Sequence, residues 1–388
     1  MKKIVILTSL IALFVILTGC GGGGTVTPPE GQTGDMTGIV YAPNGTDPVS
    51  GVLIYVVDRS GGGTGPAPSE EHYAFDYTNP DGSFSLPEIP IGMQLVKISK
   101  GAFAKEFEVN VIVGANALPA ASTTLPASTG GGGTVEKMLV VTGNYDNIEV
   151  VLAKLGLADV SEYGDLVYGT EKFTLIDGNS SLDDTTYQNF MDFFADPANY
   201  ADYRTIFFNC GNDYESDFFD NADMVNGLRT WVQSGGRLYC TDWSYDFIEQ
   251  LFPEFIDFYE GADGLTTTPE EHGLAEQGDS FDQTNATILN ANLLAWLQAI
   301  GATNADDTVT IEGWLSGWAA IDTIGTSTAG WVEAPVWVMG TESTRITTVT
   351  FESGTGIVFY SSYHTEELLS TEILPQERIL QYFVFEVL

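Results

Sequence analysis

Hydrophobic and polar residues follow two different patterns along this chain. In the first part, short runs such as 52–57 and 105–113 are rich in β-branched residues or alternate apolar with polar side chains, as strands do. The turn sequence NPDG at 79–82 separates such runs, because Pro, Asn, Asp and Gly favour tight turns. Residues 36–118 are therefore predicted to form a small all-β sandwich.

In the second part, apolar strands alternate with helices. The run 138–142 is continuously apolar, which is typical of strands covered on both faces, and 205–209 is predicted to be a further strand. Apolar residues then recur at helical spacing, as in 148–155. This order predicts a doubly wound, flavodoxin-like α/β domain with a parallel sheet over 136–388. The tryptophan-rich stretch 261–350 is less regular and is predicted to be an insertion or an antiparallel extension of the sheet.

The first twenty residues have the pattern of an export signal. Two lysines precede an apolar run at 4–16, which is short for a membrane span and ends in small residues. The ending LTGC at 17–20 resembles a bacterial lipobox, which implies cleavage before Cys20 and lipidation of its thiol. The membrane is thus an expected partner, and the cell envelope the expected location, at the outer membrane if the cell is Gram-negative because Gly21 follows. An ordinary signal peptide and an uncleaved anchor are the alternatives.

Two segments rich in Gly, Pro, Ser and Thr, 21–35 and 119–135, are predicted to be linkers. Between them, TGIVYAPNGTDPVSGVLIYVVD, TNPDGSFSLPEIPIG and LVKISKGAFAKEFEVNV resemble a carboxypeptidase regulatory-like domain. That resemblance implies a transthyretin-like sandwich that serves as a spacer or binding module, and it carries over no catalytic residue.

The charge balance excludes one class of partner. The chain has 53 acidic and 14 basic residues and a net charge of −39, so nucleic acid, which is bound through Lys and Arg, is not expected as a partner. The acidic segments 177–184 and 217–223 offer oxygen ligands for a divalent cation but lack EF-hand spacing, so a solvated acidic surface is favoured and structural calcium is the alternative. No metal or cofactor is predicted, since three dispersed histidines disfavour zinc, although Glu271 and His272 could approach His364.

One short stretch is a candidate for chemistry. The sequence GGRLYC at 235–240 and the late SYHTE at 362–366 resemble the nucleophile and histidine elements of class I glutamine amidotransferase-like domains. The resemblance implies a triad of Cys240, His364 and Glu366, in which imidazole activates a thiolate. This sequence departs from the family at the elbow, where Leu238 and Asp242 replace glycines and the acidic side chain opposes thiolate formation.

Cys210 leaves three interpretations of Cys240 open. Both cysteines are predicted to end neighbouring parallel strands, so a Cys210–Cys240 disulfide is one interpretation in an oxidising compartment. Reduced, buried thiols are the second, and a catalytic Cys240 is the third. The favoured function is a non-catalytic envelope module that binds a glycan, peptide or protein, and the alternative is a cysteine-dependent hydrolase or amidotransferase-like enzyme.

Overall fold

The computed structural model describes residues 31–57, 72–260, 264–365 and 370–386. The predicted lipidation site Cys20, the signal segment before it and Glu366 lie outside the described residues. Within the described part, no helix has both the length and the apolar character needed to cross a membrane.

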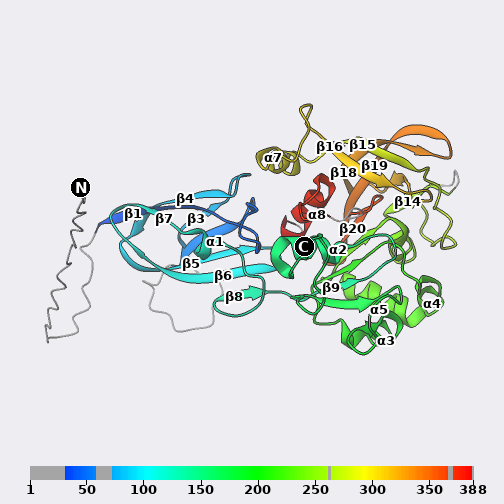
Figure 1. The fold of residues 1–388 in the computed structure, drawn as a ribbon, viewed down its shortest axis with the longest axis horizontal. Helices are drawn as coiled ribbons and strands as arrows, with labels where there is room; N and C mark the ends of the chain where they lie inside the picture. Colours follow the sequence, from blue (N-terminus) through cyan, green and yellow to red (C-terminus); the bar gives the residue numbers. More distant parts are fainter. Residues whose placement is uncertain (1–30, 58–71, 261–263, 366–369, 387–388) are drawn as a thin grey trace, which may run out of the picture.

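The N-terminal part consists of two facing β-sheets, at the left of Figure 1. Alternate residues of the strands are buried, as at Ile54 and Val56, because one face of each sheet covers the core between them. The three-stranded sheet has the order β4 (Ser83–Pro90), β1 (Thr33–Ile39), β7 (Gly114–Ala117). The five-stranded sheet has the order β3 (His72–Tyr77), β2 (Leu53–Val57), β5 (Gly92–Lys100), β6 (Phe103–Val111), β8 (Gly133–Val135).

The segment 119–135, predicted to be a linker, is instead packed into the sandwich. It contains α1 (Ala120–Thr123) and β8, which pairs antiparallel with β6. The Thr123 hydroxyl donates to the Ile39 carbonyl at 2.6 Å, and the Leu125 amide donates to the Tyr41 carbonyl at 2.8 Å. The sequence pattern missed this because its composition is linker-like, whereas its backbone groups complete an existing sheet.

The C-terminal part is built on one mixed sheet of ten strands. Six strands run parallel: β11 (Gln188–Asn189), β10 (Thr174–Asp177), β9 (Met138–Val141), β12 (Thr205–Phe208), β13 (Arg237–Thr241) and β20 (Gly356–Ser361). The sheet continues in antiparallel fashion with β19 (Thr341–Ser353), β18 (Thr328–Val338), β15 (Phe281–Ile288) and β16 (Thr308–Trp314). A separate two-stranded sheet joins β14 (Ile256–Phe258) to β17 (Ile321–Ile324).

The predicted doubly wound, flavodoxin-like domain is therefore wrong. The chain is mostly β, and antiparallel strands joined largely by hairpins form one end of the large sheet. The strand–helix alternation of 138–241 does not continue through 281–353, where the long hairpin of β18 and β19 replaces βαβ units. A local pattern that indicates parallel pairing thus holds for only one part of the sheet.

Alternate residues of the parallel strands face two separate apolar layers. On β12, Phe207 belongs to one cluster and Ile206 and Phe208 to the other, because successive strand residues point to opposite faces. Helices on both sides contribute to these clusters. They are α2 (Ile148–Leu152) with its π-helical continuation, α3 (Phe190–Phe194), α4 (Glu215–Phe219), α5 (Ala222–Gln233), α6 (Asp246–Glu249), α7 (Ala291–Ala299) and α8 (Pro375–Glu386).

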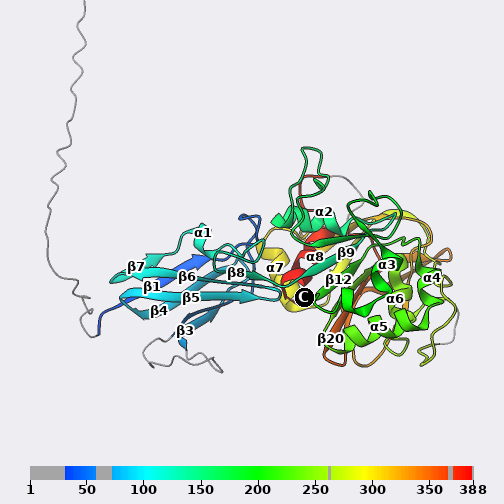
Figure 2. The ribbon, with the colours of Figure 1, turned by 90° about the horizontal axis from the view of Figure 1, so that it is seen from below.

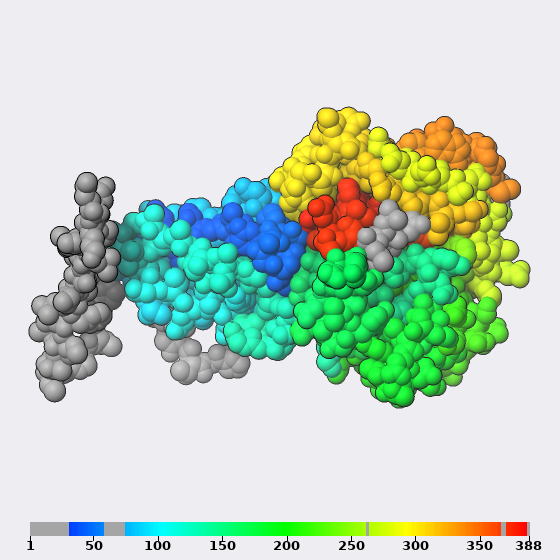
Figure 3. All heavy atoms as spheres, viewed as in Figure 1, coloured from blue at the N-terminus to red at the C-terminus, as the bar shows by residue number. Residues whose placement is uncertain are grey.

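The sandwich packs end to end against the C-terminal part, with α8 at the junction (Figures 1, 2 and 3). Arg378 of α8 forms an ion pair with Asp47 at 2.6 Å, and the Trp296 indole donates to the Pro48 carbonyl at 3.2 Å. The ring of Phe103 lies 5.0 Å from that of Phe385. The junction therefore combines polar contacts with aromatic packing.

Candidate functional site

Three side chains with distinct chemistry meet at the carboxyl ends of neighbouring parallel strands. Cys210 lies just beyond β12, Asp242 just beyond β13 and His364 just beyond β20. These strands are adjacent in the sheet, so the residues that follow them emerge at the same edge. We call these three residues the Cys–Asp–His cluster.

The cluster is compact and buried. The His364 Nε2 atom lies 2.9 Å from Asp242 Oδ2 and 3.3 Å from Cys210 Sγ, and the sulfur lies 3.6 Å from the same carboxylate oxygen. Cys210, Asp242 and His364 are 1%, 2% and 3% exposed. One sulfur, one nitrogen and one oxygen thus converge on a single point.

The backbone at Asp242 is in the left-handed region, with φ of 42°. This residue begins the 3₁₀-helix η3 (Asp242–Tyr245), immediately after β13 ends. A non-glycine residue at positive φ is uncommon, and such strain is concentrated at functional positions. The Ala319 amide donates to Asp242 Oδ1 at 2.8 Å, and the Tyr360 hydroxyl donates to the Asp242 carbonyl at 3.2 Å. These contacts fix the carboxylate against the cluster.

The geometry does not activate the Cys210 thiol. Burial, and then the negative charge of Asp242, raise the pKa of Cys210 well above its ordinary value, whereas a nucleophilic thiol needs a lowered pKa. In a nucleophilic triad, the imidazole uses one ring nitrogen for the nucleophile and the other for the carboxylate. Here Cys210 and Asp242 contact the same nitrogen of His364.

The structure places Cys240 differently from the sequence prediction. Cys240 lies within β13, pairs with Tyr360 in register, and packs in the apolar cluster that includes Leu238. The cysteine that contacts His364 is Cys210. Cys210 and Cys240 are both free thiols in the structure, so the disulfide that was one of the three interpretations is not formed there. The physical reason is that Cys240 faces the core inside a strand, whereas Cys210 lies beyond the end of its strand.

The sequence pattern does not reveal the role of Asp242. It also allows His272 to approach His364, whereas the structure places the His272 ring elsewhere. By sequence, Asp242 is only an obstacle to a thiolate at Cys240, but in the fold it is itself a member of the cluster. The signal that could have found it is that three residues with side chains capable of binding a metal each follow a predicted strand. The His272 ring instead packs against Phe219, with 6.0 Å between the ring centroids.

Buried polar groups surround the cluster and position its members. The Thr365 amide, next to His364, donates to both Asp146 carboxylate oxygens at 3.1 Å. The Asn209 side chain, next to Cys210, donates to Glu149 Oε2 at 2.7 Å. Burial raises the pKa of Glu149 to about 7. At this edge of the sheet, the carboxyl groups of Asp146 and Glu149 are therefore buried and shielded from water.

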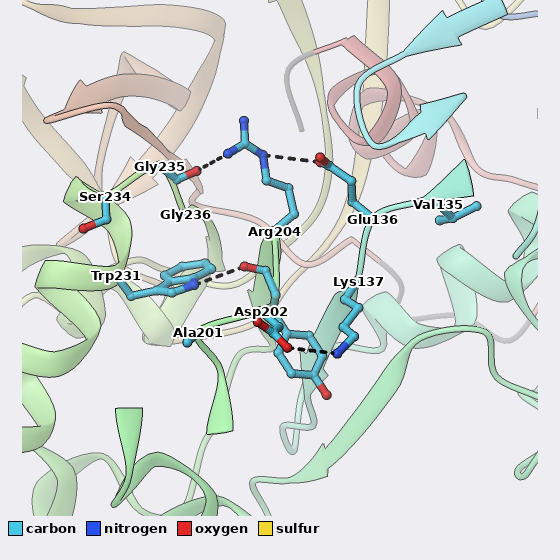
Figure 4. Close-up of a pocket in the computed structure, with 11 residues that line it drawn as sticks. Val135, Glu136, Lys137, Ala201, Asp202, Arg204, Trp231, Ser234, Gly235 and Gly236 are labelled. Atoms are coloured by element: carbon cyan, nitrogen blue, oxygen red, sulfur yellow. Dashed lines mark hydrogen bonds and ion pairs between the residues drawn. The ribbon is translucent and has the colours of Figure 1, made fainter. Parts of the chain in front are cut away.

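A pocket of about 420 Å³ lies at the opposite, amino-terminal edge of the parallel strands (Figure 4). Its two basic side chains already have partners. Arg204 donates to the Gly235 carbonyl at 2.7 Å and pairs with Glu136 at 3.4 Å, and Lys137 pairs with Asp202 at 3.5 Å. This pocket is separate from the Cys–Asp–His cluster.

Comparison with known proteins leaves the family open. No family model matches the chain, and none of the curated proteins matches it. Among solved structures, a Thermoplasma acidophilum protein assigned as one component of GMP synthase is 8% identical, with TM-score 0.36, over 64% of this chain and 92% of its own.

Two further structures are similarly distant. A GH42 β-galactosidase from G. stearothermophilus is 7% identical, with TM-score 0.30, over 64% of this chain and 29% of its own. A cohesin–X-dockerin complex of Acetivibrio cellulolyticus is 15% identical, with TM-score 0.18, over 34% of this chain and 77% of its own. At these scores the likenesses carry no functional argument, so function is inferred from the chain's own side chains.

Proposed function

We propose that the C-terminal part is a metal-binding, non-catalytic module and that Zn²⁺ is the ion held by the Cys–Asp–His cluster. The observation that carries this proposal is the mutual spacing of the three ligand atoms, 2.9, 3.3 and 3.6 Å. A tetrahedral Zn²⁺ with ligand bonds of about 2.0–2.3 Å would hold such atoms about 3.3–3.6 Å apart. Binding the ion therefore requires only small shifts of these side chains.

The ligand types favour zinc over other common ions. Ca²⁺ and Mg²⁺ take oxygen ligands, whereas a mixture of thiolate, imidazole and carboxylate suits Zn²⁺. The groups around the ligands also fit this function. The Ala319 amide holds the second oxygen of Asp242, and the backbone N–H of Trp243 donates to the sulfur of Cys210. Such outer contacts orient metal ligands, and the burial of all three ligands favours an ion that stabilises over one that processes a substrate.

Metal analysis of the purified protein tests this proposal. We expect about one equivalent of zinc after loading and desalting, and a sulfur-to-cobalt charge-transfer band after substitution with Co²⁺. Cys210→Ser should lose the band and most of the zinc, because the thiolate ligand is gone. Cys240→Ala is the matched control and should keep both. Wild-type protein without bound zinc, or equal retention of metal in the two variants, would overturn the proposal.

We also propose that Cys20 carries lipid and anchors the module in the cell envelope, at the outer membrane in a Gram-negative cell, where it meets a glycan, peptide or protein ligand. The lipobox-like LTGC at 17–20 supports this proposal. Labelled palmitate should be incorporated into the wild type and not into Cys20→Ser, which should appear in the soluble fraction. Incorporation of equal label into Cys20→Ser would contradict lipidation at this residue.

A further inference from the structure

A second group of potential ligands lies on other elements and contains only oxygen donors. Glu249 ends α6, Glu260 follows β14, and Glu270 lies in the loop before His272. One carboxylate oxygen from each lies within 4.8 Å of the others. Glu249 is 4% exposed and the other two are partly buried. We call these three residues the glutamate cluster.

In the described part of the chain, one buried oxygen of Glu249 and one of Glu260 lack a hydrogen-bond donor. Among the described residues, Glu249 Oε2 and Glu260 Oε2 are both buried and without a hydrogen-bond partner, as is Oδ1 of Asp246 on the same helix as Glu249. A carboxylate removed from water without a partner is costly, so a native site of this kind needs a compensating group. This observation is independent of the acidic composition of the cluster.

The neighbouring charges also disfavour a negative charge on Glu249. Burial, and then the neighbouring carboxylates of Asp246, Glu270 and Asp257, raise the pKa of Glu249 to about 8, and the hydrogen bond from the Gln250 side chain offsets only part of this rise. The basic side chain of Arg229 lies nearby on α5, but its guanidinium donates to the carbonyls of Leu251 and Gln250 and to the Asn226 side chain. These hydrogen bonds of Arg229 go to neutral oxygens and not to the acids.

We infer that the glutamate cluster is a binding site for Ca²⁺. Oxygens that bind one Ca²⁺ at about 2.3–2.6 Å lie within about 5 Å of one another, which agrees with the observed 4.8 Å limit. Ca²⁺ also accepts irregular geometry from segments that are far apart in the sequence, whereas Mg²⁺ demands a near-ideal octahedron. This site differs from the Cys–Asp–His cluster in residues, ligand chemistry and ion, so it stands independently of the proposed zinc site.

The test uses chelator-treated mature protein in excess MgCl₂, titrated with CaCl₂ by calorimetry and with Tb³⁺ by luminescence. Tyr259, next to Glu260, is a suitable sensitiser for Tb³⁺. We expect saturable binding of one ion. Glu249→Gln removes a buried carboxylate that would bind Ca²⁺ after losing its proton, and should weaken Ca²⁺ binding by at least about tenfold. Glu271→Gln, at the exposed neighbour of Glu270, is the matched control and should bind as wild type.

Melting temperatures measured with and without Ca²⁺ distinguish a loss of Ca²⁺ binding from a general loss of folding in the variants. Without Ca²⁺ at neutral pH, Glu249→Gln should melt at a higher temperature than wild type, because glutamine avoids the cost of keeping a buried carboxyl protonated that the unfolded chain ionises. With Ca²⁺, only the wild type and the Glu271→Gln control should gain stability. Absence of saturable binding up to about 10 mM, above the usual range of extracellular calcium modules, would overturn the inference. Equal weakening in both variants would also overturn it, and loss of Ca²⁺ binding in Cys210→Ser would show that the two sites are not independent.

Discussion

Glu149→Gln should make the protein more stable at neutral and alkaline pH. Glu149 is 4% exposed and lies on α2, where the Asn209 side chain donates to it. Burial, and to a smaller extent Asp146, raise its pKa from the 4.5 of an unfolded chain to about 7. The folded protein therefore holds a proton on this carboxyl between pH 4.5 and 7 that the unfolded chain has released.

The sign and size follow from this difference in proton binding. The contribution of Glu149 to stability is complete below pH 4.5 and is lost as pH rises toward about 7. The full loss is about 3 kcal/mol, since each pKa unit corresponds to about 1.4 kcal/mol. A glutamine has no proton to lose. Its amide oxygen can accept from Asn209, and its amide nitrogen can donate to Asn209 Oδ1, which is buried without a partner in the described part of the chain.

Urea unfolding at pH 5, 6, 7 and 8 in the presence of chelator measures this effect. The difference in free energy of unfolding between Glu149→Gln and wild type should grow toward about 3 kcal/mol between pH 5 and 8. The exposed Glu162→Gln is the control and should follow the wild type. A difference that stays constant with pH would refute the reasoning, because a packing effect has no such dependence.

Three further predictions concern buried groups. Lys154→Met should lower the free energy of unfolding in urea by about 3–5 kcal/mol. The Lys154 ammonium lies 2.8 Å from the buried Glu377 carboxylate, which would lose its ion-pair partner. The double variant with Glu377→Gln should recover most of this loss. Phe247→Ala should cost about 3–5 kcal/mol, since this fully buried ring stacks on Phe208, and a loss below about 1 kcal/mol would contradict its place in the core. Asp242→Asn should keep the fold, because asparagine tolerates positive φ, yet weaken zinc binding by more than about tenfold in a competition assay with a chelating dye. Unchanged zinc affinity in that variant would exclude its carboxylate as a ligand.

Local structure is readable from the sequence where one pattern is strong. The predicted strands 138–142 and 205–209 correspond to β9 and β12, because each contains a run of large apolar residues that are buried on both faces of the sheet. The pairing of strands is not a local property. The residues of 341–353 do not indicate their pairing partners. In the structure this strand pairs antiparallel with both β18 and β20, so the parallel part of the sheet is followed by an antiparallel part. The order of strands beyond β20 in the sheet therefore cannot be predicted from the sequence pattern.

A strand boundary decides which residue lies on the turn. The sequence pattern places Cys240 at the end of its strand, whereas β13 continues to Thr241 and the positive φ falls on Asp242. Strand ends are located from sequence only to within about two to four residues. That shift is small for the fold, but it moves a thiol from the edge of the sheet into the core and brings a carboxylate to the edge.

The ligands of both proposed sites come from distant segments, which explains why short motifs do not reveal them. Zinc motifs are recognised from paired ligands a few residues apart, but Cys210, Asp242 and His364 meet only because β12, β13 and β20 are neighbours. The acidic composition likewise favours a solvated surface, although Glu249 is buried with no donor for one oxygen among the described residues. Burial is what marks both clusters as candidate metal sites. A polar atom in contact with water is already hydrogen-bonded, whereas a polar atom buried in the fold requires a partner. The partner of each cluster is therefore predicted from the chemistry of its atoms, sulfur and nitrogen for zinc and oxygen alone for calcium.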